Sequence, residues 1–473
     1  MRTRGLFVLA FATLLILPAT AQEKTTSGQS EYILTTNPSS IDSLNLRHGL
    51  SYKATVWQDP RYGYALYLVT APSSKDPSSL RAELNSDPAT MAFEANQVIE
   101  IPERSGTTST TLAQSTDSIL DSLPGRTLVT FNGVPVPSNY VMQPATKIIR
   151  WGDALLSSGL TGRGMVAVID TGVDPNHPAL ASVLAPGFDF TRNQAGASEL
   201  NDLNPSVAAS LAQSTDSILD SNRVFQLNSS TAAILTQSTD SILDGLPEAF
   251  GHGTMTAGLV HLIAPSASIM PLKAFKSDGT SDTYNILRAI YYAVDHGSNI
   301  ISMSFEMSQP SPGLSGALDY ASDHGVVVIA AAGNDGARVP VFPAASEGVI
   351  GIGSTNNLDQ RSAFSNFGSP DVIFAAPGEG VITTYPGNHY AAGWGTSFSA
   401  PIVAGAAALI LKQHSDNLQC SVMKALTHAV QVPLMGYGRI DLYQALNTKG
   451  TIPRFADPAC EPSHEDGGFQ HPD

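Results

Sequence analysis

Three short segments of the sequence carry an acid, a base and a nucleophile. Asp170 ends the apolar run in VAVIDTGVD, His252 lies between two glycines in GHGTMTAG, and Ser397 lies at the start of GTSFSAP. A serine hydroxyl attacks a carbonyl carbon when an imidazole removes its proton and a carboxylate fixes the orientation of that imidazole. These residue types predict acyl transfer, provided that the fold brings the three segments together.

Each segment alone allows another interpretation. The D-T-G that begins at Asp170 is also typical of aspartic proteases, but those enzymes need two such loops, and the sequence has no second DTG or DSG. A lone histidine is more often structural, and a lone serine at a helix start is more often an N-cap. The combination is far more specific than any one segment, so we expect His252 and Ser397 to be catalytic.

A fourth segment lies between His252 and Ser397. In AAAGNDG, Asn334 follows Gly333 directly after an apolar run. An amide side chain in such a turn can donate a hydrogen bond to the oxygen that becomes negative during acyl transfer, although a plain turn asparagine is the alternative. We expect Asn334 to be one oxyanion donor and the backbone N–H of Ser397 to be the other.

Together the four motifs resemble those of the subtilisin-like serine proteases, in which the chain order is also Asp, His, Ser. The α/β-hydrolases place the serine first, in a G-x-S-x-G turn that is not found around Ser397. The resemblance covers about residues 140–446. It implies an endopeptidase acting on proteins or peptides in which Ser397 forms an acyl-enzyme, His252 accepts its proton, Asp170 supports His252 and Asn334 stabilises the oxyanion. It implies no metal or redox cofactor.

The same resemblance assigns a substrate-binding strand to Ser304 and Phe305, with Gly333 also in contact with the substrate. Family members usually have glycines after this strand, whereas this sequence continues with Glu306 and Met307. The strand can still pair with a peptide through backbone hydrogen bonds, but we expect the pocket beside it to be narrower or charged.

One family feature is missing from the sequence. Relatives that bind calcium tightly usually have Asp where this chain has Ala179, and a calcium-binding loop after the helix of the catalytic histidine, which this chain lacks. Calcium needs six or more oxygen ligands, so we expect no metal at that site.

These side chains must be positioned by alternating strands and helices. The runs VAVID, SIMPLKAF, IISMSF, VVVIAAAGN and VIGIGS are apolar without polar alternation, which predicts buried parallel strands. Residues 281–297 predict a helix capped by Ser281 or Asp282, and a second helix begins near Ser397 with Pro401 near its first turn. We expect an α/β fold: a three-layer α/β/α sandwich with a mostly parallel sheet, preceded by a small α+β domain.

Changes in composition divide the chain into five parts. Residues 1–21 have two arginines, an apolar run and small residues before the expected cleavage point, which is typical of a signal peptide. Residues 22–103 resemble the inhibitory propeptide of the family, and we expect them to inhibit the enzyme until self-cleavage. Residues 104–140 are rich in Ser, Thr, Pro and Gly and predict a linker. The peptidase domain is expected at 141–446 and a tail at 447–473.

The octapeptide QSTDSILD occurs three times, once in the linker and twice in an insertion at about residues 190–247 of the peptidase domain. Its spacing is irregular, which excludes a solenoid with a fixed period. A duplicated surface segment without chemistry, an added β-hairpin and a site cut by the enzyme itself all remain possible.

Composition narrows the class of protein and its location. Charged residues make up 14% of the 473 residues and the formal net charge is −16, which argues against a nucleic-acid partner. A membrane anchor is the alternative to the signal peptide, but the leading apolar run is shorter than the roughly 20 residues that span a bilayer. We expect a secreted monomer, extracellular or periplasmic, with no membrane association after signal cleavage.

Two cysteines, Cys420 and Cys460, are present. Outside the cytoplasm two thiols in one domain usually pair, so we expect one disulfide that ties the tail to the preceding domain. Two buried free thiols are the alternative.

Two other functions remain open at this stage. A protein on the same fold could bind partners without catalysis, or it could use the triad on other acyl groups as a lipase or transferase. Hydrolysis of a denatured protein but not of a short-chain ester separates the second from a peptidase.

Overall fold

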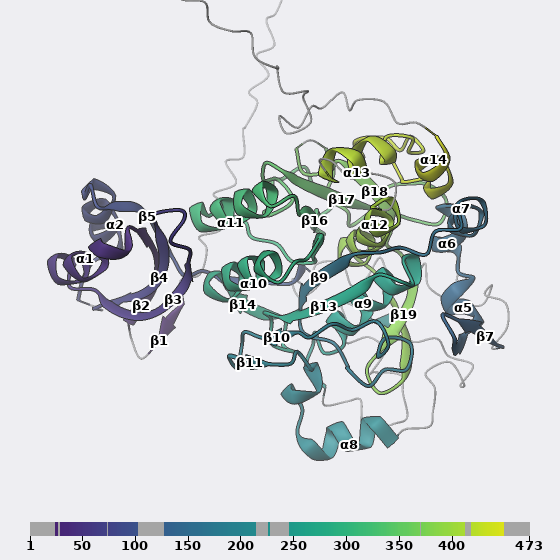
Figure 1. The fold of residues 1–473 in the computed structure, drawn as a ribbon, viewed down its shortest axis with the longest axis horizontal. Coiled ribbons are helices and arrows are strands. Elements are labelled where there is room, and N and C mark those ends of the chain that lie inside the picture. Colours follow the sequence, from purple (N-terminus) through teal and green to yellow (C-terminus); the bar gives the residue numbers. More distant parts are fainter. Residues whose placement is uncertain are drawn as a thin grey trace, which may run out of the picture.

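The computed structural model describes residues 24–26, 29–72, 74–102, 127–213, 226–227, 246–368, 370–411 and 418–448. Figure 1 shows a smaller module, formed by residues 24–102, beside a larger body that contains the rest. The expected signal peptide, the first and third octapeptides, all but the first residue of the second, and residues 449–473 lie outside the described residues.

The body is built on a sheet of eight strands. The order across the sheet is β11 (Gln194–Ala195), β10 (Phe188–Asp189), β13 (Ser268–Lys273), β9 (Met165–Asp170), β15 (Ile300–Met303), β16 (Val327–Ala331), β17 (Val349–Thr355) and β18 (Phe374–Pro377). All neighbouring strands are parallel except β10 and β11. The five apolar runs in the sequence are β13, β9, β15, β16 and β17, so the predicted parallel sheet is confirmed.

Helices cover both faces of the sheet, as its apolar strands require. Along β9, Val166 and Val168 belong to the core cluster of α9 (His252–Ile263) and α12 (Thr396–Ile410). Ala167 and Ile169 belong instead to the cluster of α10 (Thr283–Asp295) and α11 (Pro312–Asp323). Side chains alternate between the two faces of a strand, so these two clusters are the two sides of a three-layer sandwich.

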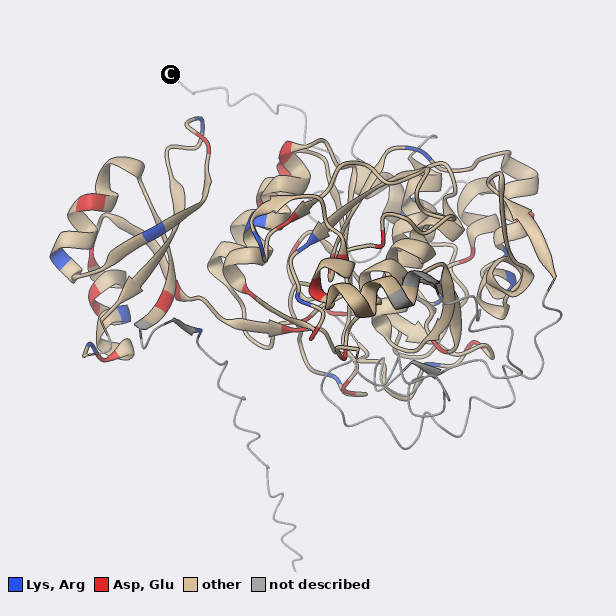
Figure 2. Cartoon of the chain, turned by 90° about the horizontal axis from the view of Figure 1, so that it is seen from below, with Lys and Arg blue, Asp and Glu red and all other residues tan. Residues whose placement is uncertain are grey.

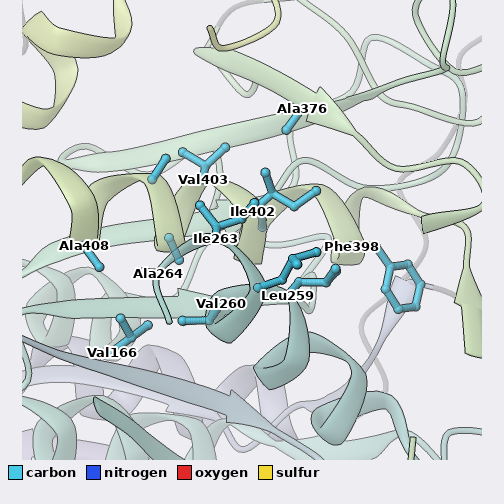
Figure 3. Close-up of a cluster of buried hydrophobic side chains, with 14 of the residues drawn as sticks. Val166, Leu259, Val260, Ile263, Ala264, Ala376, Phe398, Ile402, Val403 and Ala408 are labelled. Carbon is cyan, nitrogen blue, oxygen red and sulfur yellow. The ribbon is translucent and has the colours of Figure 1, made fainter. Parts of the chain in front are cut away.

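The layer formed by α9 and α12 is packed very closely. Figure 3 shows Ile402 and Val403 of α12 beside Leu259 and Ile263 of α9. All residues of both helices are buried, and a Cβ added at Gly405 would lie 2.6 Å from Cβ of Ile263. The small residues that follow Ser397 in the sequence therefore let the two helices approach each other.

The insertion contributes several short elements to the body. After β10 and β11 the chain forms the 3-10 turn η3 (Glu199–Asp202) and α8 (Pro205–Gln213). Farther along, β12 (Gln226–Leu227) pairs in parallel with β20 (His389–Gly393), which pairs with β19 (Val381–Tyr385). The described parts of the insertion are therefore packed on the body.

Residues 127–140 differ from the predicted linker. They form a hairpin of β7 (Leu128–Phe131) and β8 (Val134–Pro137), followed by α5 (Ser138–Val141). Tyr140 is fully buried and its hydroxyl donates to the carbonyl oxygen of Gly258 at 2.7 Å. The prolines and glycine that suggested a linker lie in or next to this hairpin, so composition alone placed the start of the body too late.

The smaller module has its own core. Strands β2 (Gln29–Thr36), β3 (Ser51–Gln58), β4 (Ala65–Ala71) and β5 (Thr90–Ala95) form an antiparallel sheet with β1 (Thr25–Thr26) at one edge. Two helices, α1 (Ile41–His48) and α2 (Pro77–Ser86), contribute Leu44, Leu80 and Leu84 to the core of this module. This arrangement is the small α+β unit that the alternating pattern predicts.

The remaining helices complete the body. They are α6 (Pro144–Ile148), α7 (Trp151–Ser158), α13 (Leu418–Leu426) and α14 (Leu442–Asn447). No helix within the described ranges is long and apolar enough to cross a membrane. Figure 2 shows Lys and Arg scattered among Asp and Glu over both parts of the molecule.

Candidate active site

Asp170 is the last residue of β9, at the carboxyl edge of the parallel sheet. Its Oδ1 accepts hydrogen bonds from the backbone N–H of Thr171 and from Nδ1 of His252, both at 2.7 Å. Its Oδ2 accepts from the Thr256 hydroxyl at 3.1 Å. These bonds fix the carboxylate plane, and its side chain is 2% exposed.

His252 begins α9, and the residue before it explains its position. Gly251 has a φ of 93°, and a Cβ there would lie 2.2 Å from the ring of Tyr385, so only glycine fits. The imidazole is buried and its Nδ1–H donates to Asp170. In the neutral ring this leaves the Nε2 lone pair as the group that can accept a proton.

Ser397 lies in the first turn of α12 and is fully buried. Its hydroxyl donates to the carbonyl oxygen of Ser304 over a long distance of 3.5 Å, and the Ser304 hydroxyl donates to the carbonyl oxygen of Ser397 at 3.0 Å. The end of β15 and the start of α12 are thus joined by these two contacts. The ring of His252 is near the same turn, with its centroid 5.6 Å from that of Phe398.

Asn334 follows β16 and is oriented by the residue before the serine. Its Oδ1 accepts from the backbone N–H of Thr396 at 2.9 Å and from the Thr396 hydroxyl at 3.0 Å. These two bonds occupy Oδ1 and orient the amide, whose only donor is Nδ2. Gly333 has a φ of 92° and its N–H donates to the same Thr396 hydroxyl at 3.2 Å.

The fold brings the predicted residues to one edge of the sheet, because β9, β15 and β16 are neighbouring parallel strands. Asp170 and His252 are in direct contact, and Ser397 contacts Ser304. Phe305 is different, because its side chain is fully buried and packs 5.2 Å from the ring of Phe275. Only its backbone is placed where a peptide could pair.

A strand of the smaller module runs through this region. In β6 (Val98–Glu100), Ile99 pairs with Ser281 of β14 (Thr280–Asp282), and the two strands are antiparallel. Glu100 forms an antiparallel bridge with Glu306, one step beyond Phe305, and the Ile101 N–H donates to the carbonyl oxygen of Gly279 at 3.1 Å. The segment therefore lies between two edges of the body as an added strand.

The added strand also fills apolar space. Ile99 and Ile101 are each 2% exposed and belong to the same core cluster as Phe305. This cluster spans the module and the body. The residues 279–282, on the second edge, were not recognised from the sequence because backbone pairing of this kind has no side-chain motif.

Two buried charged residues near the site were also missed. Glu199 of η3 is fully buried and contacts the start of α9, and Lys273 at the end of β13 donates to the carbonyl oxygen of Thr171 at 2.7 Å. Each is a single charged residue outside any motif. A buried charge is costly without partners, so its significance becomes visible only when its contacts are known.

The part of the chain that the structure describes contains no group of three or more His, Cys, Asp and Glu side chains that could hold a metal ion. Ala179, where calcium-binding relatives usually have Asp, is buried at 2% exposure. Cys420 is buried in α13, but Cys460 lies outside the described residues, so the disulfide stays a prediction.

Comparison with known proteins agrees with this geometry. Residues 162–438, more than half of the chain, match the model of the subtilase family. The chain is 32% identical over 287 residues to the thermophilic serine proteinase of Bacillus sp. (strain AK1), covering 59% of this chain and 61% of that protein. It therefore spans less than two thirds of the length of this relative.

Two shorter relatives are covered more fully. Thermitase of Thermoactinomyces vulgaris is 33% identical over 269 residues, which are 54% of this chain and 78% of thermitase. Subtilisin BL of Lederbergia lenta is 31% identical over 267 residues, which are 54% of this chain and 79% of that protein.

Proposed function

The chain belongs to the subtilase family of serine endopeptidases, and from this premise we propose that Ser397 is its nucleophile, His252 its general base and Asp170 the residue that orients His252. The observation that carries this assignment is the 2.7 Å contact between Nδ1 of His252 and Asp170 at the sheet edge where Ser397 begins α12. It fixes the tautomer in which Nε2 can accept a proton.

Acylation needs one local movement. Rotation of the Ser397 side chain away from the Ser304 carbonyl oxygen would bring Oγ toward Nε2 of His252. As Oγ attacks the substrate carbonyl carbon, its proton passes to His252, and Asp170 stabilises the positive charge on the ring. His252 then gives that proton to the leaving amine. A water molecule, deprotonated by His252, hydrolyses the acyl-enzyme and restores Ser397.

The negative oxygen of each tetrahedral intermediate needs donors that are in place beforehand. We assign this role to Nδ2 of Asn334 and the backbone N–H of Ser397. Thr396 supports this role because it holds the Oδ1 side of the Asn334 amide and so directs the donor end. The start of α12 adds the favourable end of a helix dipole to the same place.

We further propose that substrates bind as the strand of residues 98–101 does. An extended peptide would pair with residues 279–282 on one side and with residues 304–306 on the other. The smaller module would then inhibit the enzyme by holding its own strand in the place of a substrate. Secretion, the signal peptide at 1–21 and self-cleavage between Glu103 and Tyr140 belong to this proposal.

The test is the intact mass of the wild-type protein beside the Ser397→Ala variant, each expressed as the full chain. We expect the wild type to lose the residues before a cleavage point in 103–140 and to hydrolyse denatured protein. We expect the variant to keep those residues and to be inactive, because it lacks the nucleophile. Asn334→Ala removes one proposed oxyanion donor but leaves the nucleophile in place. We therefore expect this variant to stay active, with kcat about 10²–10³-fold lower.

Two results would contradict the proposal. If Ser397→Ala hydrolyses denatured protein at the wild-type rate, Ser397 is not the nucleophile. If both proteins keep the smaller module and neither is active, the fold serves binding and not catalysis.

A further inference from the structure

Glu199 occupies an unusual position for a carboxyl group. It begins η3, in the insertion between Asp170 and His252, and it is 0% exposed. A buried carboxyl group costs several kcal/mol unless hydrogen bonds compensate for the lost water. Its partners therefore indicate what it contributes to the fold.

One set of partners is the start of the helix that carries His252. Oε2 of Glu199 accepts from the backbone N–H of Gly251 at 2.7 Å. Oε1 accepts from the backbone N–H of Thr254 at 3.3 Å and from the hydroxyl of the same residue. Gly251 is the N-cap of α9 and Thr254 lies in its first turn, where N–H groups lack partners within the helix. Glu199 therefore fixes the start of α9.

The other partner belongs to the turn that follows Asp170. The Thr171 hydroxyl donates to Oε2 of Glu199 at 3.2 Å and accepts from the backbone N–H of Gly253 at 2.9 Å. The backbone N–H of Thr171 in turn donates to Oδ1 of Asp170. A single carboxyl group thus connects the residue after Asp170 with the residues on both sides of His252.

The packing around this connection leaves almost no room for adjustment. A Cβ added at Gly253 would lie 1.9 Å from the carbonyl oxygen of Gly172, and one added at Gly172 would lie 2.5 Å from that of Ala197. Three segments are therefore in direct backbone contact: the segment before Glu199, the turn after Asp170 and the first turn of α9.

The far end of η3 holds the same turn from another side. Asp202 pairs with the fully buried Lys273 at 2.7 Å, and Nζ of Lys273 also donates to the carbonyl oxygen of Thr171 at 2.7 Å. The two acidic residues of η3 thus reach Thr171 through its hydroxyl and through its carbonyl oxygen.

We propose that Glu199 is a positioning residue for catalysis, which holds the start of α9 against the Thr171 turn and so sets the distance and angle between His252 and Asp170. This inference rests on the proposed roles of Ser397, His252 and Asp170. Displacing a reacting group by about 1 Å can lower the reaction rate about 100-fold. Glu199 contacts Thr171 and Gly251, the residues next to Asp170 and His252, so its contacts can control displacements of this size.

If Glu199 has this role, its ionisation should make kcat depend on pH. Burial raises the pKa of the Glu199 carboxyl to about 8; bonds from Thr254 and Gly251 and the charge of Lys273 oppose this rise, and the charge of Asp170 adds to it. Besides these groups, His252 lies at the start of α9, which Glu199 contacts. Tyr385 of β19 interacts electrostatically with Glu199, and Asp202 shares its turn. Ionisation of Glu199 places negative charge near His252, which stabilises the imidazolium formed in the reaction.

The experiment compares Glu199→Gln with wild type in the full, self-processed protein, using a peptide substrate between pH 6 and 10. Above pH 8, where the wild-type carboxyl is ionised and only accepts, we expect kcat of the variant to be about 10- to 100-fold lower with KM within about twofold, because the amide places a donor against the donors of α9. We expect kcat of the wild type to rise as Glu199 ionises near pH 8, and this rise should be absent in Glu199→Gln. Glu199→Asp, which keeps the charge one methylene shorter, should retain that rise.

Asp441→Asn is the matched control. Asp441 is also a buried carboxylate at a helix start, accepting from Gln444 at 3.0 Å, but it caps α14. Its loss should lower the melting temperature and leave kcat and its pH profile unchanged.

The outcomes are distinct from failure of the proposed function. If Ser397→Ala is active, the proposed function fails. If Ser397→Ala is inactive but Glu199→Gln keeps wild-type kcat and its pH profile, only the positioning role fails. If both Glu199 variants lose activity together with folding, Glu199 is a structural residue and the inference is overturned.

Discussion

Two buried histidines outside the candidate active site affect how the stability of the protein depends on pH. His177 donates through Nε2 to the carbonyl oxygen of His389 at 3.1 Å, and its Nδ1 accepts from Ala179 at 3.3 Å. His261 is buried against the ring of Phe131, with 5.2 Å between ring centroids. Both rings therefore fit the neutral form.

Burial lowers the pKa of both His177 and His261 to about 4. In the unfolded chain a histidine titrates near 6.5, so between about pH 6.5 and pH 4 the unfolded state binds more protons than the folded state. We predict that the free energy of unfolding falls as the pH is lowered through this window, by up to roughly 3 kcal/mol for each histidine. Urea unfolding of Ser397→Ala at pH 7 and pH 5 measures it without self-digestion.

The matched variants are His177→Gln and His296→Gln in the same background. Gln keeps a donor for His389 but does not titrate, so His177→Gln should have lower stability at pH 7 and a shallower decline toward pH 5. His296 is the exposed C-cap residue that follows α10, and its replacement should leave the slope unchanged. An unchanged slope in His177→Gln would show that His177 does not contribute to acid sensitivity.

At the scale of elements, the geometry of the proposed catalytic residues depends on how closely α9 and α12 approach. His252 begins one helix and Ser397 lies in the first turn of the other, so a shift between the helices moves the proposed base and the proposed nucleophile apart. Gly405 lies at their contact, where a Cβ would be 2.6 Å from Cβ of Ile263 and 3.1 Å from the carbonyl oxygen of Val260. The backbone oxygen cannot move without bending α9.

We predict that Gly405→Ala lowers the free energy of unfolding by about 1–3 kcal/mol, because the added methyl overpacks this contact. It should also lower kcat, since the helices can relieve the clash only by separating. Gly152→Ala is the control, because Gly152 lies in α7 with nothing within 4 Å of an added Cβ. That change should stabilise the protein by about 0.5–1 kcal/mol. Equal effects of the two changes would contradict the packing argument.

At the scale of the whole molecule, the smaller module completes two helices of the body. Glu94 accepts from the backbone N–H of Gly313 at 2.7 Å, at the start of α11. Oδ1 of Asn96 accepts from the backbone N–H of Tyr284 at 2.9 Å, at the start of α10. These donors have no partners within their helices, so the module stabilises the body as well as covering its candidate active site.

Aromatic stacking adds to this interface. The ring of Trp57 stacks on Tyr291 of α10 with centroids 4.3 Å apart and meets Tyr320 of α11 edge-on at 4.9 Å. Trp57 is 6% exposed. Large buried aromatic residues of this kind usually carry much of the energy of an interface.

We predict that Trp57→Ala loosens the module in the full-length Ser397→Ala protein. The readout is hydrogen exchange at the Tyr284 amide, which is bonded to Asn96 only while the module is docked. Its exchange should become about tenfold to a thousandfold faster, as expected when an opening reaction becomes easier by about 1.4–4 kcal/mol.

Leu46→Ala provides the comparison, because Leu46 lies in α1 of the same module but is 86% exposed. Its replacement should leave exchange at Tyr284 unchanged. If Trp57→Ala also leaves it unchanged, the module is held by the strand of residues 98–101 and the helix caps without an essential contribution from stacking.

The sequence alone determined the chemistry and the class of fold. Asp170, His252, Ser397 and Asn334 were identified because each lies in a short local motif, in which neighbouring glycines or apolar residues also predict a strand end or a helix start. The parallel sheet was equally readable, because strands buried on both faces have continuous apolar runs. Family membership confirms the class of enzyme and the class of fold, while the roles of the four residues stay predictions.

Only the tertiary structure decided how these residues are supported and covered. The contacts of Glu199 with α9, of Lys273 with the Thr171 turn, and of residues 98–101 with residues 279–282 join segments far apart in the chain. Backbone hydrogen bonds and single buried charges leave no repeated pattern along a sequence. Their partners are set by packing in three dimensions, so the roles of these residues can be inferred only from the structure.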